Sequence, residues 1–137
     1  MDKLAVKKYL EKLQNEICVT LSSADKNSFL ADRWERAEGG GGESRLFSNG
    51  SFIEKGGVNF SHVFGNSIPT AATIKRPELV GAAWEAMGVS VVIHPSNPHV
   101  PTVHMNVRFF SARKGDTDIW WFGGGYDLTP FYGYEDD

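Results

Sequence analysis

The sequence predicts an α+β domain in which one helix is followed by a large antiparallel sheet. Apolar residues recur at helical spacing only near the N-terminus. Later segments are short, rich in β-branched and aromatic residues, and joined by short polar links. That succession is typical of an antiparallel sheet and differs from the strand–helix alternation of a doubly wound fold. A chain of 137 residues is expected to form one domain, so residues 1–137 are treated as a single unit.

The first segment is predicted to be a helix with Asp2 as its N-cap. Its apolar residues recur at near-helical spacing, with lysines and glutamates between them: Leu4, Leu10, Leu13, Ile17 and Leu21. Such a stripe needs a partner surface, and the sheet is the expected one. Cys18 lies beside the stripe and is expected to be a small buried hydrophobic residue.

Residues 22–43 are predicted to be irregular, apart from a short turn around Phe29 and Trp34. The four glycines at 39–42 are not expected in a helix interior or a stable strand. Several interpretations stay open for them: a flexible linker, a tight, strained turn, or a close approach to a ligand. No Gly-Lys-Ser/Thr follows, so a phosphate-binding Walker loop and a nucleotide-binding domain are excluded.

Strands are predicted at 45–47 and 51–54, on either side of the hairpin signal Asn49-Gly50. Residues 58–64 alternate as a strand does, and further strands are predicted at 88–93, 103–110 and 118–122. The stretch 70–84 is ambiguous, and Pro77 suits the first position of a helix there. Residues 94–102 contain three prolines, so this link is expected to be stiff and non-helical.

The composition restricts partners and location. The net charge of -3 gives no general reason to expect nucleic acid, and no run of like charges appears. An anionic ligand would therefore have to meet locally placed cations. The single cysteine excludes an internal disulfide and suits a reducing compartment. Because no signal peptide and no apolar run of membrane-spanning length is present, we expect a cytoplasmic protein without integral membrane association.

The strand around residue 106 carries an unusual polar row. Side chains alternate across a strand, so His104, Asn106 and Arg108 share one face. The opposite face is apolar and predicted to be core: Val103, Met105, Val107 and Phe109. The preceding strand behaves similarly, with Ser90 and His94 on one face.

Two interpretations of this row stay open. It could be the solvated face of an antiparallel sheet. Such a face usually carries Lys, Glu and Thr, however, whereas His, Asn, Arg and Ser suit recognition of an anion. An arginine fork binds a carboxylate bidentately, Asn and Ser add neutral hydrogen bonds, and His moves protons near neutral pH.

A second constellation runs from Trp120 to Pro130, where aromatic residues lead through three glycines to Asp127. Glycines of this kind allow a close backbone approach to a ligand or a sharp bend. Asp127 is expected at the end of an element, either as a functional carboxylate or as a cap of the turn before Thr129-Pro130.

A metal site is only weakly indicated by the residues themselves. None of the four histidines lies in a zinc-binding helix motif, and no cysteine pair exists. His94 and His104 could converge across a hairpin, but two imidazoles do not complete a site. Further ligands would have to come from another chain or another segment.

From about Phe29 to the end, the sequence motifs resemble those of the oxygen-dependent coproporphyrinogen III oxidase family and follow one another in the same order. The matching segments are Arg45-Leu46-Phe47, Glu54 to Ser61, Arg76-Pro77-Glu78-Leu79, Met87-Gly88-Val89-Ser90, His94-Pro95, Asn97-Pro98, Val100-Pro101-Thr102, Asn106 to Phe110, Trp120 to Gly125, and Asp127-Leu128-Thr129-Pro130. So many motifs in one order make chance similarity an untenable explanation.

The resemblance implies a large antiparallel sheet flanked by helices, a homodimer, and a substrate cleft over the sheet. It implies an enzyme of haem biosynthesis that oxidatively decarboxylates two propionates of coproporphyrinogen III to vinyl groups. The product would be protoporphyrinogen IX, with O₂ consumed and carbon dioxide and hydrogen peroxide released. It implies no organic cofactor and leaves open whether a divalent metal is required.

The resemblance also assigns residues. Ser90, Asn106, Val107 and Arg108 correspond to substrate-contacting positions, and His104 to the proposed proton donor. Asp127 corresponds to the carboxylate that contacts the pyrrole nitrogens. His94 and His104 correspond to histidines suggested as metal ligands.

The chain departs from the family in length, because family members are longer. Residues 1–137 are therefore expected to be the N-terminal portion of a single coproporphyrinogen III oxidase domain. The alternative to an active enzyme is a catalytically incomplete fragment that binds a tetrapyrrole or dimerises.

Overall fold

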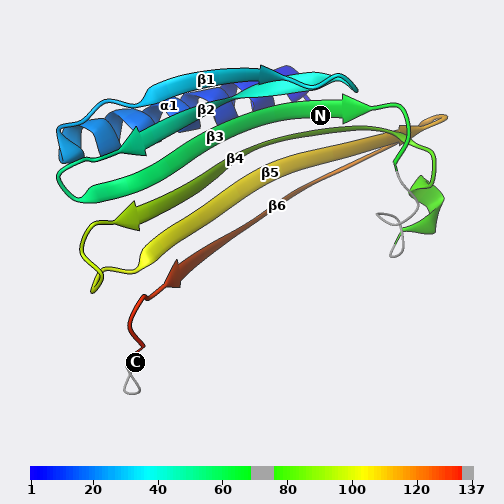
Figure 1. Ribbon diagram of the computed structural model, residues 1–137. Coiled ribbons are helices and arrows are strands. Elements are labelled where there is room, and N and C mark those ends of the chain that lie inside the picture. The colour runs from blue at the N-terminus through cyan, green and yellow to red at the C-terminus, as the bar shows by residue number, and fades with distance from the viewer. Residues whose placement is uncertain (69–75, 134–137) are drawn as a thin grey trace.

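The computed structural model, which describes residues 1–68 and 76–133, is an α+β fold built on one antiparallel sheet (Figure 1). Within these residues the sheet has six strands in the order β1-β2-β3-β4-β5-β6, so each strand pairs with its neighbours in sequence. The elements are helix α1 (Lys3–Asp25), β1 (Leu30–Glu35), β2 (Gly40–Ser48), β3 (Ile53–Gly65), the 3₁₀ turn η2 (Pro77–Leu79), β4 (Ala83–Pro95), β5 (Thr102–Lys114) and β6 (Thr117–Thr129). The predicted fold class is confirmed.

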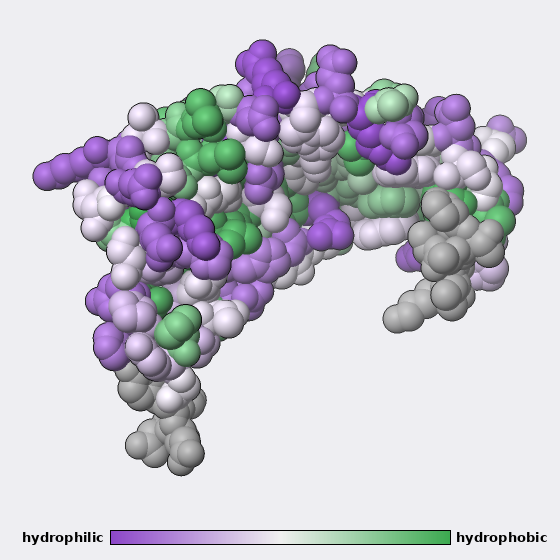
Figure 2. All heavy atoms as spheres, viewed as in Figure 1, coloured by the Kyte–Doolittle hydropathy of each residue, from purple (hydrophilic) through white to green (hydrophobic). Residues whose placement is uncertain are grey.

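The long strands curve, so that the sheet arches over a wide hollow (Figures 1 and 2). Helix α1 lies against one face and packs chiefly on β3 and β4. The opposite face carries η2 at one end, where Leu79, Ile68, Ala82 and Ala112 form a small second core. The middle of that face has no helix over it within the described residues.

Helix α1 begins as predicted, because the Asp2 carboxylate accepts a hydrogen bond from the Ala5 amide at 3.0 Å. It ends at Asp25, and the capping residue Lys26 has a left-handed φ of 52°. Leu10 and Cys18 are buried, while Leu13, Ile17 and Leu21 pack against the same core. The prediction was wrong for Leu4, which is 61% exposed because it lies on the solvent side of the first turn.

The main core lies between α1 and the sheet. Alternation along the strands directs its members to one face: Phe47, Val58, Phe60, Met87, Val89, Val91 and Phe109. Phe109 is fully buried, and Met105 and Val107 pack beside it. The predicted apolar face of this strand is therefore confirmed as core.

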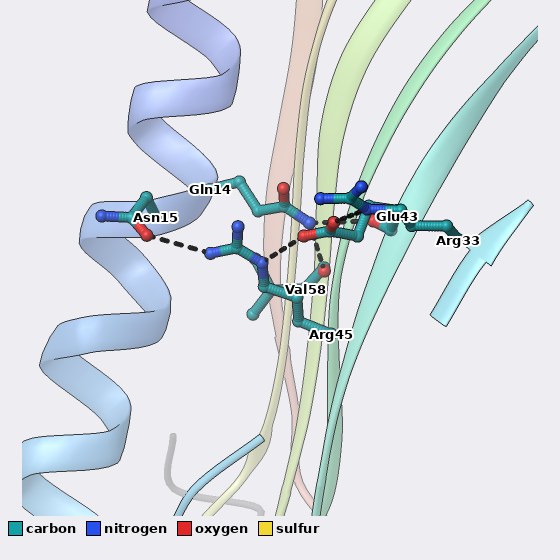
Figure 3. A network of polar contacts seen from close by, with 6 residues as sticks. All are labelled: Gln14, Asn15, Arg33, Glu43, Arg45 and Val58. Carbon is teal, nitrogen blue, oxygen red and sulfur yellow. Dashed lines mark hydrogen bonds and ion pairs between the residues drawn. The ribbon is translucent and has the colours of Figure 1, made fainter. Parts of the chain in front are cut away.

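A buried polar residue, Gln14, fastens α1 to the sheet (Figure 3). Its side chain is 3% exposed, and Nε2 donates hydrogen bonds to the main-chain oxygens of Glu43 at 2.8 Å and Val58 at 3.0 Å. A buried amide without partners would destabilise the fold, so these two bonds fix which turn of α1 meets β2 and β3. The apolar stripe alone did not reveal this contact.

Beside Gln14, the carboxylate of Glu43 is held by two arginines (Figure 3). Arg33 Nε donates to Oε2 at 2.8 Å and Arg45 Nε to Oε1 at 2.7 Å. Arg45 also reaches Asn15 Oδ1 of the helix at 3.2 Å. The hydrogen bonds from Arg33 and then Arg45 lower the pKa of Glu43 below its usual range.

The expectation of irregular structure over 22–43 was wrong. Helix α1 continues to Asp25, and β1 and β2 account for most of the rest. Gly41 and Gly42 are paired with both β1 and β3, and Gly40 is paired with β3. The strand forms there because a Cβ at Gly42 would overlap the Trp34 ring and the Phe60 carbonyl, so only glycine permits such close pairing. The tight-turn interpretation holds at Gly39 and Gly40, whose φ values are +126° and +90°.

The later elements agree with the prediction in kind and differ in length. Asn49, with φ of 56°, turns the chain between β2 and β3. The two strands predicted at 51–54 and 58–64 are one strand with a register shift near Lys55. Pro77 opens only a single 3₁₀ turn, and the predicted ambiguity at 70–84 lies partly outside the described residues. Strand β6 continues without interruption through Gly123–Gly125, so the strand does not end at a sharp bend there.

Candidate functional site

The register of β4, β5 and β6 gathers the predicted polar residues on the sheet face opposite α1. Ser90 lies opposite Asn106, and Asn106 lies opposite Gly125. Two residues along the same strand, His104 lies opposite Asp127. The polar row therefore continues across three strands, and Asp127 belongs to it.

His104 and Asp127 are in direct contact. The distance from His104 Nδ1 to Asp127 Oδ2 is 2.8 Å, and Thr129 Oγ1 donates to the other carboxylate oxygen at 3.3 Å. An ionised carboxylate only accepts hydrogen bonds, so Nδ1 must carry the proton. The pair therefore holds the imidazole in one orientation and leaves Nε2 for a ligand. Both side chains are partly open to solvent, at 38% and 55% exposure.

Arg108 extends over the same face. Its Nη2 donates to Asn106 Oδ1 at 3.3 Å, so the Asn106 amide oxygen faces the arginine and Nδ2 points away from it. Its neighbours across the sheet are Gly88 and Gly123, neither of which has a side chain to cover it. The guanidinium is thus held by Asn106 of its own strand and is not covered by a side chain of the neighbouring strands. This arrangement suits the binding of a carboxylate.

Two predicted site residues, Val107 and His94, lie apart from the contacts made by His104, Asp127, Asn106 and Arg108. The Val107 side chain packs against the core on the α1 face, so only its main chain borders the polar face. His94 Nδ1 lies 3.4 Å from Thr102 Oγ1, at the end of β4. His94 shares the face of His104, and the roles assigned to these residues stay predictions.

The described part of the chain does not provide a complete set of metal ligands. Within residues 1–68 and 76–133, no three His, Cys, Asp or Glu side chains are grouped closely enough to hold one. The Nδ1 atom of His104 is already directed at Asp127. The described residues therefore offer a metal ion no set of three such ligands.

A cavity of about 310 Å³ opens on the polar face. Its polar lining comes from three strands: Asn59, Ser61, Ser90, Asn106 and Arg108. The sequence prediction did not single out Asn59 and Ser61 of β3. The available signal was alternation, because Val58 and Phe60 face the core and the residues between them must face the other way.

A second titratable cluster lies on the α1 face, away from this cavity. His62 Nε2 is 2.7 Å from Glu85 Oε1, and Lys3 Nζ is 2.8 Å from Glu85 Oε2. Burial raises the pKa of Glu85, but the hydrogen bonds from Lys3 and His62 outweigh it, so the pKa lies below its usual range. This cluster ties the start of α1 to the sheet.

The fold and this face together define an α+β protein whose sheet presents an arginine, neutral donors and a carboxylate-supported imidazole. Such a surface suits an organic ligand that carries carboxylates. Residues 5–137 match the coproporphyrinogen III oxidase family, and the chain belongs to that family. The family comprises oxidoreductases of haem biosynthesis, and its name gives coproporphyrinogen III as the substrate. Within the described residues, no helix is both long and apolar enough to cross a membrane.

Proposed function

We propose that this protein catalyses the oxygen-dependent decarboxylation of two propionates of coproporphyrinogen III, giving protoporphyrinogen IX. The observation that carries the proposal is the sheet face on which Arg108 and the His104–Asp127 pair lie together. The first group binds a carboxylate and the second transfers a proton. A substrate with several propionates calls for both groups, because its carboxylates must be held and the reaction moves a proton.

The chemistry balances without an organic cofactor. Each propionate loses carbon dioxide, one proton and two electrons and becomes a vinyl group. O₂ accepts those two electrons with two protons and becomes hydrogen peroxide. The net reaction therefore takes up one proton for each propionate converted. The electron-rich pyrrole is the group that reacts with O₂.

The residues have distinct roles in this proposal. Arg108 binds one propionate through its fork, while Ser90 and Asn106 add neutral hydrogen bonds. His104 moves a proton at Nε2, because its Nδ1 is directed at Asp127. The Asp127 carboxylate orients this imidazole and accepts hydrogen bonds from pyrrole N–H groups of the bound macrocycle. Positioning of the macrocycle then brings the reacting propionate to His104.

We include a homodimer and a cytoplasmic location in the proposal, on the strength of the resemblance. A divalent metal stays a prediction, because the described residues offer no complete ligand set. Coproporphyrinogen III and O₂ are then the small-molecule partners.

The test is an aerobic assay of the full chain that follows carbon dioxide, peroxide and, after oxidation of the product, fluorescent protoporphyrin. His104→Gln is expected to lower kcat by about 10²–10⁴, the usual contribution of a general acid or base. His62→Gln is the matched control, because His62 lies on the α1 face and its replacement keeps a donor for Glu85. Its turnover should stay within about threefold of the parent.

Two results would refute the assignment. Unchanged decarboxylation in His104→Gln and Asp127→Asn would remove both residues from the chemistry. Binding of the tetrapyrrole with no turnover under any aerobic condition would favour the alternative, a catalytically incomplete binding fragment. Peroxide and carbon dioxide formed in equal amounts support the oxygen-dependent reaction.

A further inference from the structure

Strand β3 brings two polar side chains to the cavity that the proposed roles do not use. Asn59 lies opposite Ser90, and Ser61 lies opposite Gly88. Gly88 in turn lies opposite Arg108 on β5. Ser61, Gly88 and Arg108 therefore form one rung across three neighbouring strands, with Asn59 and Ser90 two residues along.

Gly88 leaves a recess in the middle of this row of residues. A Cβ at Gly88 would lie 2.7 Å from the Val107 carbonyl oxygen and 3.2 Å from Arg108 Cβ. Because glycine has no Cβ, the sheet surface is recessed between Ser61 and Arg108. Adjacent strands are about 4.8 Å apart, so these two residues stand roughly 9.6 Å apart at their Cα atoms. That span accommodates a small planar anion hydrogen-bonded from both sides.

The neutral donors around this recess have no hydrogen-bond partner among the described residues. Asn59, Ser61 and Ser90 are partly buried, and none makes a side-chain hydrogen bond within the part of the chain that the structure describes. Half-buried polar groups of this kind favour a partner from a ligand or from solvent. Arg108 supplies the positive charge among the described residues that line the cavity. As far as the chain is described, the lining of the recess therefore combines one cation with neutral donors and no acidic group.

We propose that Asn59 and Ser61 complete, with Arg108, a carboxylate-binding position above Gly88 that anchors a propionate which is not the one reacting. The inference rests on the proposed function and deepens it. Arg108 and His104 are four residues apart on β5, which is about 13 Å along a strand. A carboxylate held above Gly88 is thus too far from the His104–Asp127 pair to be the group undergoing decarboxylation there.

This separation gives the two ends of the face different kinetic signatures. Loss of an anchoring contact weakens binding of substrate and transition state together, so KM rises and kcat changes little. Loss of the proton-transfer group lowers kcat instead. Asn59 and Ser61 are therefore specificity-determining residues, selecting substrates that carry a carboxylate at the anchored position.

The experiment measures kcat and KM for coproporphyrinogen III, and Kd for coproporphyrin III by fluorescence, with variants of the full chain. Ser61→Ala removes one hydrogen bond to a charged group and is expected to raise KM and Kd about 10-fold. Asn59→Asp has nearly the same shape but adds a negative charge, so a larger increase is expected. Ser61→Thr keeps the hydroxyl and should restore binding.

Ser44→Ala is the matched control. Ser44 shares the face and the rung of Asn59 but lies one strand further from Arg108, outside the cavity lining. Its KM and Kd should stay within twofold of the parent. Thermal unfolding of each variant separates a binding effect from a folding defect.

The outcomes distinguish this inference from the proposed function. If Arg108→Ala weakens binding while Ser61→Ala and Asn59→Asp bind like the parent, the anchoring position is wrong and the wider function stands. If the parent neither binds nor turns over the tetrapyrrole, the proposed function itself fails. A fall in kcat at unchanged KM in Ser61→Ala would also overturn the inference, because it would place Ser61 at the reacting group.

Discussion

Replacement of Gln14 by methionine tests whether hydrogen bonds, and not only apolar contact, hold α1 on the sheet. Met has a similar length and volume, so the packing change is small. The variant loses the two bonds from Nε2 to the main-chain oxygens of Glu43 and Val58. Each neutral hydrogen bond contributes about 1 kcal/mol net.

The expected loss in the free energy of unfolding is therefore about 2 kcal/mol. It approaches 3 kcal/mol if water cannot reach the two carbonyl oxygens that lose their partner. For a domain of this size, about 2 kcal/mol corresponds to a decrease in Tm of roughly 6–8 °C. Equilibrium urea unfolding followed by circular dichroism gives the first quantity, and calorimetry gives the second.

The control for this measurement is Lys12→Met, two positions away on the same helix. The Lys12 side chain is 74% exposed and makes a surface ion pair with Glu16, so its replacement should change stability by less than about 0.5 kcal/mol. A Gln14→Met protein as stable as the parent, with an unchanged urea m-value, would refute the reasoning. The helix would then be held by apolar burial alone.

Three further predictions concern the fold around the site. Gly88→Ala should lower Tm and weaken substrate binding, because the new methyl group meets the Val107 carbonyl and displaces Arg108, whereas Gly123→Ala, which has open space, should leave Tm unchanged within about 2 °C. Asp25→Ala should lower the free energy of unfolding in urea by about 2–4 kcal/mol, since the buried carboxylate accepts hydrogen bonds from the main-chain amides of Phe52 and Ile53, where β3 begins. Asp25→Asn, which keeps an acceptor, should lower it less. The pKa of Glu43 is lowered in the folded state, so its stabilising effect is present above the unfolded pKa of about 4.3 and disappears as pH falls through the folded pKa. Glu43→Gln should therefore flatten the pH dependence of Tm below about pH 5. An unchanged slope would contradict the role of Arg33.

Local chemistry determined much of this protein. The Asp2 cap, the turn at Asn49 and the alternation along β5 each depend on residues close together in sequence, and all three are present in the structure. The same alternation placed His104, Asn106 and Arg108 on one face, because side chains in a strand change sides at every residue. The motifs also identified the family, which the match over residues 5–137 confirms.

Strand register decided the rest. His104 and Asp127 are 23 positions apart, and neither residue's neighbours specify that β5 and β6 align them. Likewise, the pairing of β3 with β4 brings Asn59 and Ser61 to the cavity. The glycine run was wrongly predicted to lie outside a strand, because local flexibility argues against one while close pairing with Trp34 and Phe60 stabilises it. Such contacts depend on the whole sheet. The sequence therefore suggested most of the candidate site residues, whereas their grouping, and the addition of Asn59 and Ser61, came from the tertiary structure.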